Sequence, residues 1–324
     1  MFGIPEPWWS VVRAVVWALF IIIFLAVNAI VAVWLERKVS GKIQRRIGPQ
    51  RVGRPIGWAQ TIADVFKLLV KEDVRAEATD KWVFLLAPAI PFAAITLMFL
   101  VVPWGKNLIP LNLNIGLLFV VAVTSFEVLG LFMAGWGSNN KWALLGAMRT
   151  AAAMISYELP MVLAILAVGM TAGSLNMNDV VNAQSRVPFI LIQPVAFLIY
   201  YIASLAEANR TPFDFTEAES ELVAGANIEY SGLRWAFFFL AEYGSLVGTS
   251  AIAATLFLGG WRGPILPGPV WFLIKTYLLV YVAMWIRWTL PRVRIDQLLD
   301  FGWKFLLPLA LADIAVTGLV LALL

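Results

Sequence analysis

The sequence predicts an all-α polytopic membrane protein with about eight transmembrane helices. Of its 324 residues, 61% are hydrophobic and only 14% are charged, whereas soluble domains are about 45–50% apolar and about 25% charged. Eight apolar stretches approach the roughly 20 residues that a helix needs to cross a bilayer. Lysine and arginine are also spread unevenly over the loops. We therefore expect a single transmembrane domain that occupies residues 1–324.

The eight expected spans differ in whether they contain a charged residue. Four contain none: Ala14 to Trp34, Trp82 to Val102, Leu111 to Phe126 (which should continue past Glu127 to Ala134) and Val187 to Ala206. The other four each hold one charged residue: Thr150 to Met170 (Glu158), Trp235 to Leu258 (Glu242), Pro269 to Ile286 (Lys275) and Trp303 to Leu323 (Asp313). The first span ends in ERK without a small-residue cleavage pattern, which indicates a membrane anchor rather than a signal peptide.

The loops fall into two classes by their basic charge. With their flanks, the loops after spans one, three, five and seven hold 19 of the 24 lysines and arginines. The opposite side holds Arg13, Lys106, Arg186 and Arg262. Basic loops stay in the cytoplasm, so both termini are expected on the outer side of the membrane.

Two cytoplasmic loops are long and carry opposite charge. Residues 36–81 hold eleven basic and six acidic side chains, and residues 207–232 hold six acids and one arginine. Their net charges of +5 and −5 predict that the loops pack together or share a partner. The spacing of the acids between 214 and 221 fits one face of a helix or one face of a strand, and Pro212 favours a turn before either.

The basic loop contains an amphipathic helix from Ala59 to Glu72. Its apolar residues recur at helical spacing, at Ile62, Val65, Phe66 and Leu69. Such a helix can lie in the membrane interface. Its role is either to anchor the loop to lipid or to shape a binding site beside the membrane.

The absence of cysteine and histidine narrows the chemistry of the chain. Without them there is no disulfide, no iron–sulfur cluster, no thiolate metal site and no haem or copper ligand of the usual kind. Any redox metal centre would then belong to a partner. Nucleic acid is not expected as a partner, because membrane topology accounts for the basic excess.

Three carboxylates are expected at a similar depth inside the membrane. Glu127, Glu158 and Glu242 lie about 10–12 Å from the cytoplasmic ends of their spans, at about 1.5 Å per residue. A carboxylate at such a depth is costly and marks a proton or ion path by default. The alternative is that each acid forms a buried structural pair, with Lys275 or with a backbone donor.

Several motifs together resemble one family. They occur in the order ERKVSGKIQRRIGPQRVG, ADVFKLLVKED, AGWGSNNKWALLGAMR, SYELP, AEANRTPFDFTEAESELVAGANIEYSG, FFFLAEY and PRVRIDQLLDFGWKFLLPL, and extend over roughly residues 30 to 310. The chain resembles the quinone-site membrane subunits of bacterial respiratory complex I, the proton-translocating NADH:quinone oxidoreductase.

This resemblance implies a translocase subunit without a catalytic or metal-binding residue of its own. Ubiquinone or menaquinone would be its substrate, with no metal or flavin bound by this chain. Its partners would be a peripheral iron–sulfur subunit on the cytoplasmic loops, small membrane subunits beside it, and the lipid bilayer. The chain would lie in the cytoplasmic (inner) membrane of a bacterium, with both termini on the periplasmic side.

The resemblance also assigns roles to particular residues. Residues expected to bind quinone or shape its chamber are Glu36, Arg37, Arg46, Asp64, Arg210 and Asp214. Residues expected on a proton path are Glu127, Glu158, Glu207, Asp214, Glu217, Glu219, Glu221, Glu229 and Glu242. A second possibility of a different class is a related membrane subunit of a proton-pumping hydrogenase, which need not use quinone. The peripheral subunits that co-purify would separate the two.

Overall fold

The computed structural model describes residues 6–214 and 223–323, and within these residues it is built of helices without strands. The longer helices are α1 (Glu6–Ile43), α2 (Gln60–Val70), α4 (Ala89–Val101), α5 (Gly116–Gly137), α6 (Lys141–Ala172), α9 (Pro194–Glu207), α11 (Gly232–Phe257), α12 (Gly268–Thr289) and α14 (Leu307–Leu323). Shorter ones are α3 (Lys81–Leu86), α7 (Met177–Ala183), α8 (Phe189–Ile192) and α13 (Ile295–Phe301), with a 3-10 turn at Gly225–Asn227 and a π-turn at Gly302–Leu306.

The expected membrane spans are present as helices. In the part of the chain that the structure describes, seven helical stretches are long and apolar enough to cross a membrane, which confirms the all-α polytopic fold class. The eighth expected span, Val187 to Ala206, is divided into α8 and α9 at Gln193. Pro194 fits the break, because proline has no N–H to donate and is accommodated best in the first turn of a helix, where α9 begins.

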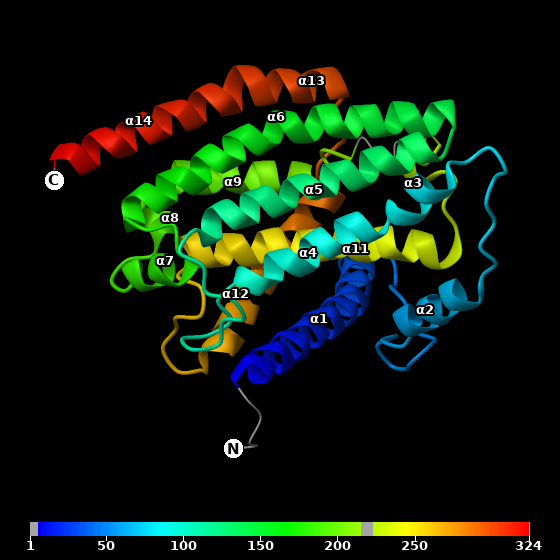
Figure 1. The fold of residues 1–324 in the computed structure, drawn as a ribbon, viewed down its shortest axis with the longest axis horizontal. Helices are drawn as coiled ribbons and strands as arrows, with labels where there is room; N and C mark the ends of the chain where they lie inside the picture. Colours follow the sequence, from blue (N-terminus) through cyan, green and yellow to red (C-terminus); the bar gives the residue numbers. More distant parts are fainter. Residues whose placement is uncertain (1–5, 215–222, 324) are drawn as a thin grey trace.

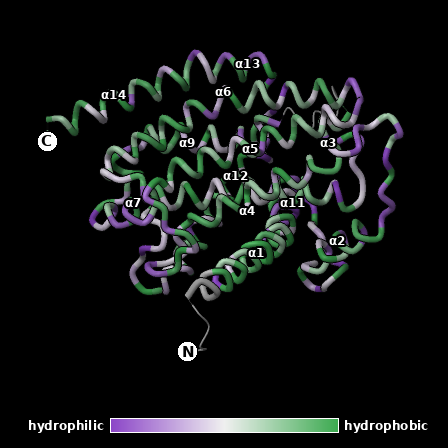
Figure 2. Tube along the Cα trace, in the orientation of Figure 1, coloured by the Kyte–Doolittle hydropathy of each residue, from purple (hydrophilic) through white to green (hydrophobic). Residues whose placement is uncertain are grey.

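Most of the long helices form one bundle (Figure 1). Helix α5 packs between α4 and α6, while α11 packs against α1, α4, α9 and α12. Helix α14 lies along α6 at the edge of the bundle. Hydrophobic residues run along the helices and hydrophilic ones concentrate in the connections (Figure 2), as expected for helices surrounded by lipid.

The connections gather at two ends of the bundle. One end, here called the basic face, holds the described segments 43–80, 137–141, 207–214, 223–232 and 289–295. Backbone N–H groups join these segments: Asp80 N donates to Gly137 O at 3.0 Å, and Val293 N donates to Pro212 O at 3.1 Å. The loops that the sequence assigned to the cytoplasm therefore share one end.

The remaining connections, 101–116, 172–194 and 258–268, form the opposite face. There Leu117 N donates to Leu175 O at 3.0 Å, and the Gln184 amide donates to Thr255 O at 2.9 Å. The alternation of the helix ends between these two faces agrees with the order of the spans predicted from the sequence.

The amphipathic helix of the basic loop is confirmed as α2. Part of its apolar surface faces away from the protein: Phe66 is 64% exposed and Leu69 is 56% exposed. The chain before α2 is tied to α1, because the Lys38 ammonium donates to Pro49 O at 2.8 Å and the Trp34 indole donates to Ile56 O at 3.1 Å. Helix α2 is thus held beside the end of α1 with an apolar side left open.

Candidate functional site

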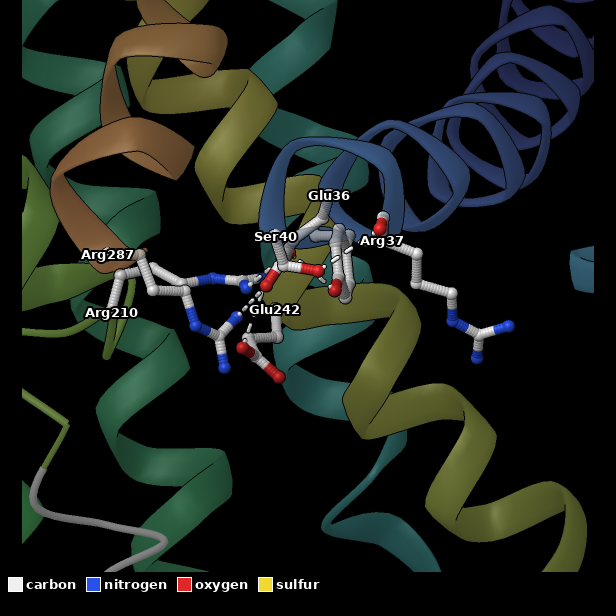
Figure 3. Close-up of polar contacts among 7 residues, drawn as sticks. Glu36, Arg37, Ser40, Arg210, Glu242 and Arg287 are labelled. Carbon is white, nitrogen blue, oxygen red and sulfur yellow. Dashed lines mark hydrogen bonds and ion pairs between the residues drawn. The ribbon is translucent and has the colours of Figure 1, made fainter. Parts of the chain in front are cut away.

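A buried arginine joins three segments that are far apart in the sequence. Arg210 is only 2% exposed, and its Nη1 donates to Glu36 Oε2 of α1 at 3.1 Å. Its Nη2 lies 3.1 Å from Glu242 Oε1 of α11. Figure 3 shows the guanidinium between the two carboxylates. One cation therefore bridges two acids from different helices.

Two further side chains complete this cluster, and neither was predicted from the sequence. Arg287 of α12 pairs with Glu36 Oε1 at 2.7 Å, and the Tyr243 hydroxyl donates to Glu36 Oε2 at 2.7 Å. The Arg210 guanidinium also lies 4.2 Å from the centre of the Tyr243 ring, a cation–π distance. Two arginines thus balance two carboxylates, as a buried ionic group requires.

The backbone at the end of α9 places Arg210 in the bundle. Helix α9 ends at Glu207, and Asn209 adopts a left-handed conformation with φ +50°. Arg210 N then donates back to Leu205 O at 3.1 Å. Asparagine is one of the few residues that accept this conformation at a helix end, and the reversal turns the next side chain back toward α1 and α11.

The surroundings of Arg210 keep it charged. Burial alone would lower the pKa of the guanidinium, but Glu242, Tyr243 and Glu36 outweigh burial and raise that pKa above its ordinary value. A raised folded-state pKa adds stability at every pH below the ordinary pKa of arginine, which is already far above neutral. The contribution of Arg210 is therefore present throughout the physiological range.

An apolar cavity of about 380 Å³ lies between α1, α2 and α11. Its walls are mostly aliphatic and aromatic, with polar groups from α1 and α2 in addition. Its lining includes Ala26, Arg37, Asp64, Val65, Phe239 and Leu240. Arg37 and Asp64 form an ion pair of 2.6 Å across the cavity rim, and Figure 3 shows that Arg37 points away from the Glu36 cluster.

Buried and half-buried carboxylates line two small cavities on the other side of α11. Glu127 and Glu242 line a cavity of about 30 Å³, together with Asn227 of the acidic loop. Glu158 and Glu207 line one of about 10 Å³, and Glu158 accepts a hydrogen bond from Ser125. A water molecule needs roughly 10–15 Å³, so each cavity has room for about one or two waters.

The structure brings most of the residues predicted for the site into these groups. Glu36, Arg210 and Glu242 meet in the buried cluster, and Arg37 meets Asp64. Arg46 is exposed and donates from Nε to Gln44 at 2.6 Å, and it does not line the apolar cavity. The Glu229 carboxylate accepts a hydrogen bond from the Asn140 amide at 2.8 Å. Asp214 is half-buried and is the last described residue before position 215.

Three predicted acids, Glu217, Glu219 and Glu221, lie outside the described residues. In the described part, the ion pairs between the two long loops do not join basic residues of the basic loop to acids of the acidic loop. They join acids of the basic loop to arginines. Arg234, just after the acidic loop, pairs with Asp73 of the basic loop at 3.0 Å, and Arg210 pairs with Glu36. Each of these contacts joins an acid of the basic loop to an arginine in the acidic loop or just after it.

Lys275 has a different environment from the one considered in the sequence analysis. Its ammonium donates to the backbone carbonyls of Leu258 at 2.6 Å, Gly260 at 3.0 Å and Arg262 at 2.6 Å. These acceptors lie on the opposite face, where α11 ends. Lys275 is therefore not the partner of Glu242. Glu242 pairs with Arg210 instead.

Comparison with known proteins identifies the family. A family model described as NADH dehydrogenase matches residues 16–318. The chain belongs to the NADH dehydrogenase family. Among its relatives is the H subunit of the NADH-quinone oxidoreductase of Dehalococcoides mccartyi (strain CBDB1), which is 52% identical over 295 residues, covering 91% of this chain and 83% of the relative.

Two further relatives carry the same name. The protein of Carboxydothermus hydrogenoformans is 50% identical over 302 residues (92% of this chain and 86% of the relative). The protein of a Geobacillus species (strain WCH70) is 51% identical over 290 residues (88% and 87%). The motif resemblance to this membrane subunit of complex I is thus confirmed, and this NADH dehydrogenase family member is a multi-pass membrane protein.

Proposed function

We propose that the chain is the membrane subunit of complex I that forms part of its quinone-binding chamber and couples quinone reduction to proton translocation. The observation that carries this proposal is the apolar cavity between α1, α2 and α11. Helix α11 supplies both a wall of this cavity and Glu242 of the carboxylate series. One helix therefore borders the two elements that the function has to connect.

The lining of the cavity suits a quinone. Its volume of about 380 Å³ lies in the usual range for small-molecule sites, about 300–1,000 Å³. Aliphatic and aromatic walls favour an isoprenoid tail, while Arg37 and Asp64 can hydrogen-bond to polar groups at the rim. The exposed apolar side of α2 would let a lipid-soluble molecule approach from the bilayer.

The carboxylates support the second half of the proposal. Reduction of a quinone consumes two protons, so the chamber needs nearby groups that exchange them. Glu242 and Glu127 share one cavity, and Glu207 and Glu158 share the next. Acids held in cavities with room for water can pass protons between them. The acids of residues 214–221 and Glu229 would supply this series from the cytoplasm.

Electrons would reach the quinone from a partner. The chain has no cysteine or histidine, so a peripheral iron–sulfur subunit docked on the basic face is the proposed donor. Small membrane subunits would pack beside the bundle. The relatives are named for NADH and quinone, which favours this function over that of a hydrogenase component. Co-purification of a nickel–iron hydrogenase would contradict the proposal.

Filling the cavity should block quinone reduction selectively. Ala26→Phe adds bulk to the lining on α1, and we expect at least a tenfold fall in NADH:quinone activity, equivalent to about 1.4 kcal/mol. Transfer from NADH to a water-soluble artificial acceptor should be unchanged, because it bypasses the membrane site. The matched control is Val27→Phe, which adds similar bulk at a neighbouring position that is 52% exposed. Equal quinone activity in the two variants would refute a quinone in this cavity.

The proposed orientation has both termini on the periplasmic side of a bacterial inner membrane. Because the chain is cysteine-free, single introduced cysteines report topology cleanly. In sealed cells, an impermeant maleimide should label Asn114→Cys, on the opposite face, and leave Arg51→Cys, on the basic face, unlabelled until the membrane is opened. The reverse labelling pattern would invert the topology.

A further inference from the structure

The opposite face carries a large cavity that the proposed function does not use. Its volume is about 640 Å³, and it lies between the segment that follows α7 and the loop from Leu258 to Gly268. Lining residues include Lys106, Asn182, Gln184, Ser185, Trp261 and Arg262. The apolar cavity and the carboxylates are elsewhere in the bundle, so this cavity requires an explanation of its own.

Positive charge collects at this cavity on a face that has little of it. The sequence places only four basic residues on the opposite face, and Lys106 and Arg262 both line the cavity. A third, Arg186, directly follows the lining residue Ser185. No acidic side chain is present in the lining that the structure describes. The cavity is therefore electrostatically suited to an anion.

The walls are held in place by buried polar contacts. The Gln184 side chain accepts from Gly259 N at 2.8 Å and donates to Thr255 O at 2.9 Å, which joins the two walls. Lys275 holds the carbonyls of the 258–262 loop, including Arg262 O at 2.6 Å. Gly259 and Gly260 take positive φ values of +71° and +48°, which glycine adopts without strain. The cavity is thus a built feature of the fold.

Two buried donors on residues that line the cavity lack partners. Buried Arg262 Nε and buried Trp261 Nε1 have no hydrogen-bond acceptor among the described residues. Nη2 of Arg262 makes only a long contact, 3.4 Å, to Asn182. Buried donors of this kind normally bind an acceptor, and arginine is well matched to phosphate oxygens.

The place of the cavity identifies the kind of molecule that would carry the phosphate. It lies where the helices leave the membrane, beside a loop whose Ile265 is 93% exposed and whose Leu266 is 44% exposed. A polar site next to exposed apolar side chains fits an amphiphile, and the volume is much larger than inorganic phosphate requires. We propose that this cavity binds the headgroup of an anionic phospholipid in the leaflet at the opposite face.

The test uses a cysteine reporter in the purified complex after removal of lipid. The chain has no native cysteine, so Ser185→Cys puts a single thiol of this chain in the cavity lining. Maleimide labelling of this chain is followed while phosphatidylglycerol, phosphatidylcholine or inorganic phosphate is added. We expect phosphatidylglycerol to slow labelling of Ser185→Cys and to leave the control Asn114→Cys, on the same face but away from the cavity, unchanged.

The charge of Arg262 should determine the affinity. Adding Arg262→Gln to the reporter should raise the phosphatidylglycerol concentration needed for protection about fivefold, as expected for one basic residue near an anionic lipid. Arg13→Gln, on the same face outside the cavity, should have no effect. Equal protection by phosphatidylcholine would mean apolar covering only, and equal protection by inorganic phosphate would mean a free-anion site. Either result, or no protection by phosphatidylglycerol, overturns the proposal. If the Arg262→Gln variant does not assemble, the comparison of lipids in the Ser185→Cys variant alone decides the proposal.

Discussion

Arg210→Met is expected to prevent stable assembly of the chain in the membrane. Methionine retains much of the side-chain length, but it leaves Glu36 and Glu242 without the guanidinium that both now share. Removing one partner of a buried ion pair costs about 3–5 kcal/mol, a large part of the about 5–15 kcal/mol that stabilises a typical protein. The amount of the chain in membranes and the thermal stability of the purified complex measure this effect.

The matched comparison is an exposed ion pair in the same chain. Lys304 pairs with Asp300 at 2.7 Å, with side chains 74% and 65% exposed. Lys304→Met should therefore change stability by less than about 1 kcal/mol. Adding Glu242→Gln to Arg210→Met should restore part of the lost assembly, because it removes a carboxylate charge that has lost its arginine, whereas Glu36 still pairs with Arg287. Wild-type levels and stability of Arg210→Met would show that the cluster does not hold α1, α11 and the acidic loop together.

Glu158→Gln should leave the complex assembled and strongly reduce proton translocation coupled to quinone reduction. Glutamine keeps the shape and the hydrogen bond from Ser125 but cannot release a proton. Loss of a positioned proton-transfer group typically lowers the rate about 100-fold or more. Proteoliposomes that contain the purified complex allow NADH oxidation and internal acidification to be followed together.

Two controls separate proton transfer from structure in this experiment. Ser125→Ala removes the hydrogen bond and keeps the acid, so it should reduce translocation much less than Glu158→Gln. Asp179→Asn neutralises a carboxylate on the opposite face that accepts an exposed hydrogen bond from Ser174, and it should have no effect. Glu242→Gln is less informative than the sequence suggested, because Glu242 also pairs with Arg210. Wild-type translocation by Glu158→Gln would favour a structural role for this acid.

The fold was predictable because each span is encoded locally. Every expected span corresponds to a helix or helix pair, and the apolar spacing of Ile62, Val65, Phe66 and Leu69 identified α2. The break at Gln193 was less apparent, since the residues on both sides are apolar. Pro194 was its only local signal, and proline alone does not show whether a helix bends or restarts.

The candidate site was predictable in composition but not in pairing. Three of the carboxylates that line the small cavities, Glu127, Glu158 and Glu242, were named because an acid inside an apolar span is unusual, whereas Glu207 was named only through the family resemblance. The partner of Glu36 lies 174 residues away, and no local pattern carries that information. Tyr243 had one signal, its position directly after Glu242, and Arg287 had none, because the positive-inside rule already accounted for a basic residue at that helix end.

Helix α11 separates the apolar cavity from Glu242 by little more than its own thickness. Leu240 lines the cavity, and Glu242, two residues later, is rotated about 200° around the helix axis. Two charges on either side of such a helix lie about 10 Å apart and interact by about 2 kcal/mol where the effective dielectric constant is about 20. Helix α11 is therefore a thin insulating wall, and a negative charge formed in the cavity acts on the carboxylate beyond it through the electric field, before any atom moves.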